Sequence, residues 1–325
     1  MQRLRDDRGA VAVLTALLLV PLLVCAALVV DIGASYVQRR QLQNAADAAA
    51  LAIAQDCGKA SCGDYSSTAA FFASNNVPNW DATPTTDRQV TTSFNGNSVT
   101  VRAAKLVNYA FGPVIGVDNN TVAAQATASW LSPNGGTAIL PLTISRCSFD
   151  AQVAANAGSL AGQTPTTMYL SKSANAGQCF PNSGNAVPGG FGWLMANAAA
   201  CTATSTLAAQ YVYSDPGNSV PSTCQTSNFT DQLGKTILLP LFDTVGGTGS
   251  NAWYHLYGYA AFRLIGYNFA SQYTAYSPPD TQPPCSGSDR CLRGYFLRYV
   301  EPSDNYTYGG AAGPDLGARI VALTA

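Results

Sequence analysis

The stretch that decides the fold is Ala10–Val30, AVAVLTALLLVPLLVCAALVV, in which 21 consecutive residues carry no charge. A helix of this length spans about 30 Å, the thickness of the hydrocarbon core of a bilayer. A cleavable secretion signal has an apolar core of only about 7–15 residues, and no clear A-x-A cleavage site lies at the end of this run. Pro21 lies inside it, where membrane-spanning helices tolerate a kink. We therefore predict a transmembrane helix at residues 10–30 that stays in the mature protein.

The charges on the two sides of this run differ. Arg3, Arg5 and Arg8 precede it, whereas Asp31 is the first charge after it. Basic residues favour the cytoplasmic side of a membrane. The sequence therefore predicts a cytoplasmic N-terminus at residues 1–9, a single pass through the cell membrane, and an extracytoplasmic location for the bulk of the chain.

The helix is expected to continue beyond the membrane as a stalk at residues 31–56. From Ser35 to Gln55 there is no Pro or Gly, and Ala and Gln predominate. One face of this segment carries a stripe of mostly small apolar side chains: Leu42, Ala45, Ala46, Ala49 and Ile53. Small residues allow helices to approach closely. The stripe packs either against the protein's own folded part or against neighbouring subunits.

Nine cysteines are present, and eight of them follow the apolar run that contains Cys25. The eight are Cys57, Cys62, Cys147, Cys179, Cys201, Cys224, Cys285 and Cys291. An even number beyond a membrane segment indicates disulfides in an oxidising compartment. The pairs Cys57/Cys62 and Cys285/Cys291 would close short loops. The middle four allow three pairings, of which we favour Cys147–Cys179 with Cys201–Cys224. Zinc is disfavoured because no C-x-x-C occurs and His255 is the only histidine.

The remaining chain is predicted to form an α+β fold in two parts. Residues 57–132 make a small α+β unit, with a helix in DYSSTAAFFASNNVP capped by Asp64, a hairpin in RQVTTSF and NSVTVRAA, a short helix or buried connector in VNYAFGPVIGV, and a strand in TVAAQATASWL. SPNGGT, Ser132–Thr137, is expected to be a linker or turn. Residues 137–325 are expected to form a mainly antiparallel β domain with loops held by disulfides. In its longest run, AWYHLYGYAAFRLIGYNF, alternate positions form one apolar set: Tyr254, Leu256, Ala260, Phe262 and Leu264. Trp253, His255, Tyr257 and Tyr259 occupy the other alternate positions, as a second buried face or an aromatic contact surface.

The combination of Arg8-Gly9, the long apolar run with Pro21, Asp31-Ile32-Gly33 and RRQLQNAADAAALA resembles the N-terminal domain of Tad/Flp pilus-assembly proteins of the TadE/TadG-like type. The resemblance covers residues 8–56. Looser similarity to actinobacterial TadG-like proteins extends to GGFGWL, DPGNSVPSTC and FDTVGGTGSNAWYHLYGYAAF.

The resemblance implies a hydrophobic helix that anchors an extracytoplasmic domain, with the bilayer and the Tad pilus machinery or other pilin-like subunits as partners. Some members of the family are processed after a glycine, for which Gly9 followed by Ala10 would be the junction. Processed pseudopilins carry Glu at the fifth mature position, and Leu14 stands there in this chain, which favours an uncleaved anchor.

No catalytic constellation is predicted. His255 lies in a strand-like aromatic run, which favours a structural role, and no G-x-S-x-G, H-E-x-x-H or S-x-x-K motif is present. The carboxylates Asp150, Asp231, Asp243 and Asp315 are scattered along the chain. A net charge of −1 without a basic patch argues against nucleic-acid binding. We expect no cofactor and no metal.

Two functions follow from these features. The first is a non-enzymatic, membrane-anchored component of Tad/Flp-type pilus assembly, pseudopilin-like or TadG-like, which acts by anchoring and helix packing. The second is a tethered extracytoplasmic binding module for envelope glycan, or an adhesin, whose contact surface is the Tyr/Trp-rich face of the β domain.

Overall fold

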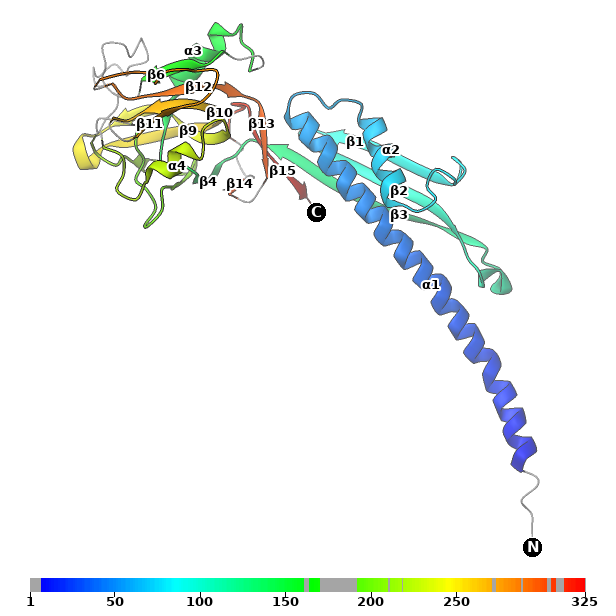
Figure 1. Cartoon of the computed structure of the whole chain (residues 1–325). Coiled ribbons are helices and arrows are strands. Elements are labelled where there is room, and N and C mark those ends of the chain that lie inside the picture. The colour runs from blue at the N-terminus through cyan, green and yellow to red at the C-terminus, as the bar shows by residue number, and fades with distance from the viewer. Residues whose placement is uncertain are drawn as a thin grey trace. The chain divides into compact units, whose positions relative to one another are not determined.

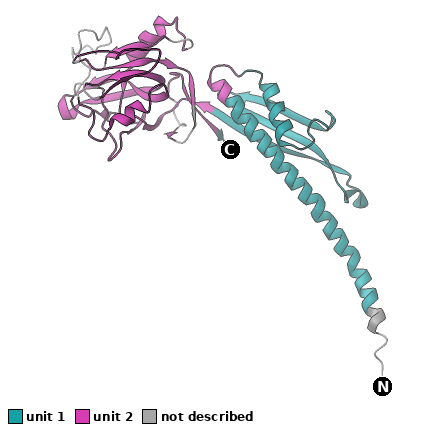
Figure 2. Ribbon diagram, in the orientation of Figure 1, with its two compact units in different colours: residues 1–54, 63–129, 323–325 teal, residues 55–62, 130–322 magenta. Residues whose placement is uncertain are grey.

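The computed structural model describes residues 7–160, 164–169, 192–209, 211–217, 219–270, 273–287, 289–302, 305–307 and 313–324. The chain divides into two compact units (Figure 2). Unit 1 comprises residues 1–54, 63–129 and 323–325, and unit 2 comprises residues 55–62 and 130–322. The division between residues 129 and 130 falls two residues before the predicted linker begins at Ser132.

A single helix, α1 (Asp7–Gly58), contains both the predicted span and the predicted stalk (Figure 1). It is 52 residues long and includes Pro21 without interruption. Asp31 and Gly33, between span and stalk, do not end the helix. The apolar span and the small-residue stripe therefore lie on one continuous element.

The strands of unit 1 form an antiparallel meander. The hairpin predicted between RQVTTSF and NSVTVRAA is present as β1 (Arg88–Asn95) and β2 (Ser98–Asn108), joined by a two-residue turn at Gly96-Asn97. The predicted strand TVAAQATASWL is β3 (Asn119–Leu131), paired with β2 from Ser98↔Ser129 to Asn108↔Asn119. Residues 109–118 form the loop between β2 and β3, and this loop contains the short 3-10 helix η1 (Gly112–Ile115).

The second helix of unit 1, α2 (Tyr65–Asn76), begins as the sequence predicts. The Asp64 carboxylate accepts hydrogen bonds from the backbone N–H of Ser67 at 3.1 Å and from its hydroxyl at 2.6 Å. These bonds to the charged form lower the pKa of Asp64, which lies at the solvent-exposed N-terminus of the helix. Asp64 is therefore a helix cap, as predicted.

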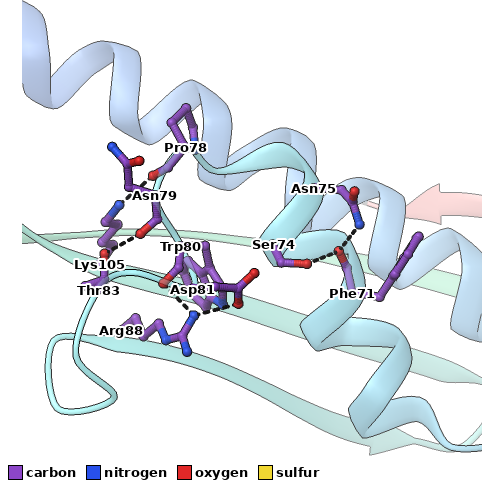
Figure 3. A network of polar contacts seen from close by, with 10 residues as sticks. All are labelled: Phe71, Ser74, Asn75, Pro78, Asn79, Trp80, Asp81, Thr83, Arg88 and Lys105. Carbon is purple, nitrogen blue, oxygen red and sulfur yellow. Dashed lines mark hydrogen bonds and ion pairs between the residues drawn. The ribbon is translucent and has the colours of Figure 1, made fainter.

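The segment after α2 is held by polar contacts to β1 and β2 (Figure 3). Arg88 donates to the carbonyl of Trp80 and pairs with the Asp81 carboxylate at 2.9 Å, while its guanidinium lies over the Trp80 ring. The Lys105 ammonium donates to the carbonyl of Pro78 at 2.7 Å. These contacts fix Trp80 in the core of unit 1.

Unit 2 is built around a mostly antiparallel sheet in the order β5-β9-β10-β12-β6, with β8 and β11 also paired to β10. The bounds are β5 (Ile144–Ser145), β6 (Thr166–Tyr169), β8 (Val212–Tyr213), β9 (Thr236–Gly246), β10 (Trp253–Asn268), β11 (Thr274–Tyr276) and β12 (Cys291–Leu297). A smaller sheet has the order β14-β4-β7, with β4 (Gly135–Ala138), β7 (Ala203–Thr206) and β14 (Tyr306–Thr307).

Two further strands, β13 (Tyr299–Pro302) and β15 (Ala318–Thr324), pair in parallel. β13 belongs to unit 2, and β15 runs from unit 2 into the last residues of unit 1. The remaining elements are α3 (Arg146–Ala155), α4 (Thr226–Thr230) and η2 (Gly249–Asn251). Together with unit 1 they confirm the predicted fold class, a long N-terminal helix followed by an α+β body with mostly antiparallel strands and disulfides.

The long strand β10 is buried on both faces in its second half. Phe262 and Leu264 lie in the largest core cluster with Trp193, Phe229 and Phe296. On the other face, Tyr259 and Ala261 pack with Tyr306 and Ile320. Trp253, His255 and Tyr257 are only partly buried. Of the alternate residues predicted to share the second face, Tyr259 is thus buried, whereas Trp253, His255 and Tyr257 are partly exposed. The difference arises because the register of β10 against β9 shifts between His255 and Gly258.

Two sequence-based expectations need correction. Ser132–Thr137 is not only a linker, because Gly135–Thr137 belong to β4 and pair with β7. For VNYAFGPVIGV the sequence predicts a short helix or a buried connector. The short helix is present as η1, but the segment is not buried, because Phe111, Val114, Ile115 and Val117 are all exposed. An apolar composition predicts burial for a segment in water, but not for a segment that contacts lipid.

Candidate membrane-anchoring site

The first part of α1 carries its apolar side chains outward. From Val11 to Val30 the side chains are exposed, apart from Ala27, which is partly buried. By length and composition this helix can cross a membrane, and its most apolar window is not buried by any other part of the described structure. Exposure of so many large apolar groups is unfavourable in water and favourable in lipid. The helix therefore provides a single-pass membrane anchor.

Beyond the span, α1 carries groups typical of a membrane interface. Tyr36 is exposed, and the Arg40 guanidinium lies 4.9 Å from the centre of its ring. Tyrosine is enriched at the level of the lipid headgroups because its ring is amphipathic. Tyr36 lies five residues after Asp31, about 7.5 Å further along the helix at 1.5 Å per residue.

The end of the span is fixed by Asp31. Its side chain is buried, with 6% of the residue exposed, and its carboxylate accepts three backbone hydrogen bonds from the β2–β3 loop. The donors are the N–H groups of Ala110 at 2.9 Å, Phe111 at 3.1 Å and Gly112 at 2.8 Å. Three consecutive N–H groups converging on one carboxylate form a small anion-binding nest.

Local sequence explains how the β2–β3 loop closes so tightly. A Cβ on Gly112 would lie 2.1 Å from the carbonyl oxygen of Val117, so only glycine fits there. Pro113 follows at the start of η1, where its missing N–H leaves no unpaired donor. The sequence identified Asp31 only as the first charge after the span. We call the contact between the Asp31 carboxylate and the N–H groups of residues 110–112 the Asp31 clamp. The sequence did not predict it, because its two halves lie about 80 residues apart and no local pattern joins them.

The stalk stripe lies inside unit 1. Leu42, Ala45, Ala46, Ala49 and Ile53 are each at most 1% exposed. Leu42 and Ala45 pack in one cluster with residues of α2, β2 and β3, namely Ala73, Ala103, Val122 and Ala124, together with Val77 and Trp80. The Gln43 amide donates to the carbonyl of Gln125 at 3.1 Å. This placement favours the alternative in which the stripe packs against the protein's own folded part.

The proposed processing junction lies at the start of α1. Gly9 and Ala10 fall within the first turn of the helix, which begins at Asp7. Cleavage after Gly9 stays a prediction.

The cysteines that the structure describes separate into one free thiol and disulfide-bonded residues. Disulfides join Cys57–Cys62, Cys201–Cys224 and Cys285–Cys291. Cys147 is also disulfide-bonded, and Cys179, its predicted partner, lies outside the described residues. Cys25, in the span, is free and exposed. Structural disulfides persist in oxidising compartments.

The described residues offer little for catalysis. His255 Nδ1 lies 2.7 Å from the Asp243 carboxylate, a pair that sequence reasoning did not join. Asp150 and Asp315 pair with arginines, and Asp231 is the C-cap of α4. Among the residues that the structure describes, no group of three or more His, Cys, Asp or Glu is placed to hold a metal ion.

Residues 9–56 match the model of the family described as "Putative Flp pilus-assembly TadE/G-like". The match coincides with α1 and ends two residues before it does. No curated protein and no solved structure matches the chain. The chain thus carries an N-terminal Tad domain, and this domain together with a membrane-spanning helix supports a pilus-related membrane protein.

Proposed function

We propose that the protein is a non-enzymatic, membrane-anchored component of Tad/Flp-type pilus assembly, which acts by anchoring and helix packing. The observation that carries this proposal is that the Tad-family match, residues 9–56, includes the exposed span, Asp31 and the buried stripe. The stripe fixes the helix to the rest of unit 1, so the span and unit 1 move together. The exposed faces of the span are then the surface available to pilin-like subunits or to the Tad machinery in the membrane.

The proposed topology places residues 1–9 in the cytoplasm and both units outside. Arginines before the span and the disulfides after it support this orientation. Neither a nucleic acid nor a cofactor has a part in the proposed mechanism.

The proposal is tested by exchanging the anchor. In a strain that lacks the chromosomal gene, two variants are compared with the wild-type chain by counting surface pili. In the first, residues 1–30 are replaced by a cleavable secretion signal, and in the second, Ala10–Val30 is replaced by an unrelated apolar span. We expect the wild-type chain to support pili and the secreted chain to fail, with the unrelated span restoring membrane attachment but not full assembly. Normal pili with the secreted chain would exclude a function that depends on anchoring.

A specific observation favours a second candidate, binding of envelope glycan. Tyr211 and Tyr213 are exposed, and the Tyr211 ring lies 4.0 Å from that of Trp253, centre to centre. Tyr213 pairs with Trp253 in the register of β8 and β10. Aromatic faces of this kind can stack on sugar rings. Sedimentation of the full chain with purified cell-wall polymer, lost in Trp253→Ala and kept in Phe94→Ala, would support it. Equal sedimentation of both variants would exclude this surface.

A further inference from the structure

The tip of the β2–β3 loop is apolar without interruption. Residues 111–117 read FGPVIGV, seven residues with no polar side chain. Their large side chains point away from the fold: Phe111 is 47% exposed, Val114 81%, Ile115 56% and Val117 45%. An exposed apolar cluster of this kind marks a contact site, because its exposure to water is unfavourable.

The tip lies alongside the predicted span. A groove of about 380 Å³ runs between the loop and α1, and it is lined by Phe111, Val114 and Ile115 on one side and by residues from Leu23 to Asp31 on the other. Asp31 lies eight positions after Leu23 on the helix, so the groove extends about 12 Å along the axis of α1. Because the interfacial Tyr36 lies beyond Asp31, the groove falls at the depth of the hydrocarbon.

Most backbone N–H groups of the loop are paired within the protein, as lipid requires. Within a bilayer every backbone polar group needs a partner in the protein, because no water is present to replace it. The N–H groups of residues 110, 111 and 112 bind the Asp31 carboxylate. Those of residues 109, 114, 116 and 117 bind carbonyls within the loop, and Pro113 has none.

We propose that the tip, residues 111–117, inserts into the lipid leaflet that surrounds Leu23–Val30, so that the protein contacts the bilayer through a second, non-spanning element. The inference rests on the proposed membrane anchoring. It adds the depth at which the loop lies in the bilayer and the orientation of unit 1 toward the membrane. Lipid fits better than a protein partner, because protein interfaces carry a polar rim and hydrogen bonds, whereas the tip offers no polar side chain. Acyl chains need none, and they can fill the groove between loop and helix.

A second contact with the bilayer would restrict motions of the protein that a single membrane-spanning helix allows. A single span can rotate about its own axis and change its tilt, and both are set by anchors at the interface. The loop is attached to α1 through Asp31 and to unit 1 through β2 and β3. Its insertion would therefore fix which face of unit 1 points toward the membrane surface.

The test uses the full chain in liposomes of phosphatidylcholine and phosphatidylglycerol, with Cys25→Ala as the background. A nitroxide label is attached to a single added cysteine in Val114→Cys, and its collision rates with oxygen, which concentrates in lipid, and with a nickel chelate, which stays in water, are measured. Val20→Cys reports the span, and Asn97→Cys, in the turn between β1 and β2, reports a water-exposed position of the same unit. All three side chains are exposed, so the variants are expected to keep the wild-type circular dichroism and unfolding midpoint.

We expect the oxygen-to-nickel ratio at position 114 to shift to the value at position 20 and away from that at position 97. A ratio at 114 equal to that at 97, with position 20 still in lipid, would overturn the insertion of the loop and leave the anchor intact. Low collision rates with both reagents at 114 would also overturn it, because a second copy or another protein would then cover the tip. Nickel access at position 20 would instead contradict the anchor itself.

Discussion

The carboxylate of Asp31 accepts a hydrogen bond from the backbone N–H of Gly112 at 2.8 Å, across 81 residues of sequence. This contact joins the end of the apolar span to the loop between β2 and β3. A buried carboxylate is favourable only when its oxygens are paired, and here three N–H groups pair with them. The β2–β3 loop of unit 1 is thereby attached to the helix at the point where the helix leaves its apolar segment.

Asp31→Asn is expected to destabilise unit 1. The amide nitrogen of Asn would face backbone N–H groups, and hydrogen bonds to a charged acceptor contribute about 1.5–3 kcal/mol. We expect a loss of about 2 kcal/mol or more on chemical unfolding in detergent, together with faster hydrogen exchange of the amides of Ala110 and Gly112. The matched control is Asp118→Asn, which removes an exposed carboxylate from the same loop. Equal stability of the two variants would contradict the role given to the clamp.

Ala46→Leu is expected to destabilise the protein by about 1–3 kcal/mol, because it adds volume to a well-packed site. Ala46 is 0% exposed in unit 1. Asn44→Leu, two residues earlier on the exposed side of α1, introduces the same side chain without crowding and should change the unfolding midpoint little. If Ala46→Leu were as stable as Asn44→Leu and instead impaired only association between subunits, the stripe would be an intersubunit surface.

Unit 2 is expected to lose stability in alkali. Burial raises the pKa of Tyr259 to about 12, and its hydroxyl lies 2.8 Å from both the hydroxyl and the carbonyl oxygen of Ser205. The unfolded chain releases this proton near pH 10, so stability is unaffected by this group below pH 10 and falls between about pH 10 and 12.

The measurement is the free energy of unfolding as a function of pH, compared with Tyr259→Phe. The variant is expected to be less stable at pH 8 but to show a shallower decline above pH 10. Burial also raises the pKa of Tyr267 to about 12. Part of the decline in stability above pH 10 is therefore expected to remain in both proteins. An identical slope in the two proteins would show that Tyr259 ionises with no penalty in the folded state.

The Cys201–Cys224 disulfide is expected to contribute more stability than Cys57–Cys62. It closes a loop with a sequence separation of 23, against 5 for the other pair. Chain-entropy estimates give about 3 kcal/mol for the longer loop and about 2 kcal/mol for the shorter. Unfolding of the two double Cys→Ala variants measures this difference, and a reversed order would show that native-state strain or packing outweighs loop entropy.

Local signals in the sequence were sufficient for the elements of unit 1. The Asp64 cap, the hairpin turn at Gly96-Asn97 and the alternation in TVAAQATASWL each depend on neighbouring residues, and the structure contains all three elements. The continuity of α1 could be predicted for the same reason. The pairing of cysteines over short loops also follows from spacing.

Contacts between distant segments could not be predicted in the same way. Nothing near Asp31 indicates that residues 110–112 will pair with it, and nothing near His255 indicates Asp243. VNYAFGPVIGV was expected to be a short helix or a buried connector. The short helix is present, but its apolar side chains are exposed beside an apolar helix. The pattern of hydrophobic residues does not tell whether protein or lipid will cover them.

The central claim is that the N-terminal helix remains in the mature protein and holds the folded body at the membrane. N-terminal sequencing of the native protein after separation of membranes from the soluble fraction tests it most directly. We predict a chain that begins at residue 1 or, after processing, at residue 10, and that leaves the membrane only in detergent. A soluble chain that begins near residue 30 would contradict the account.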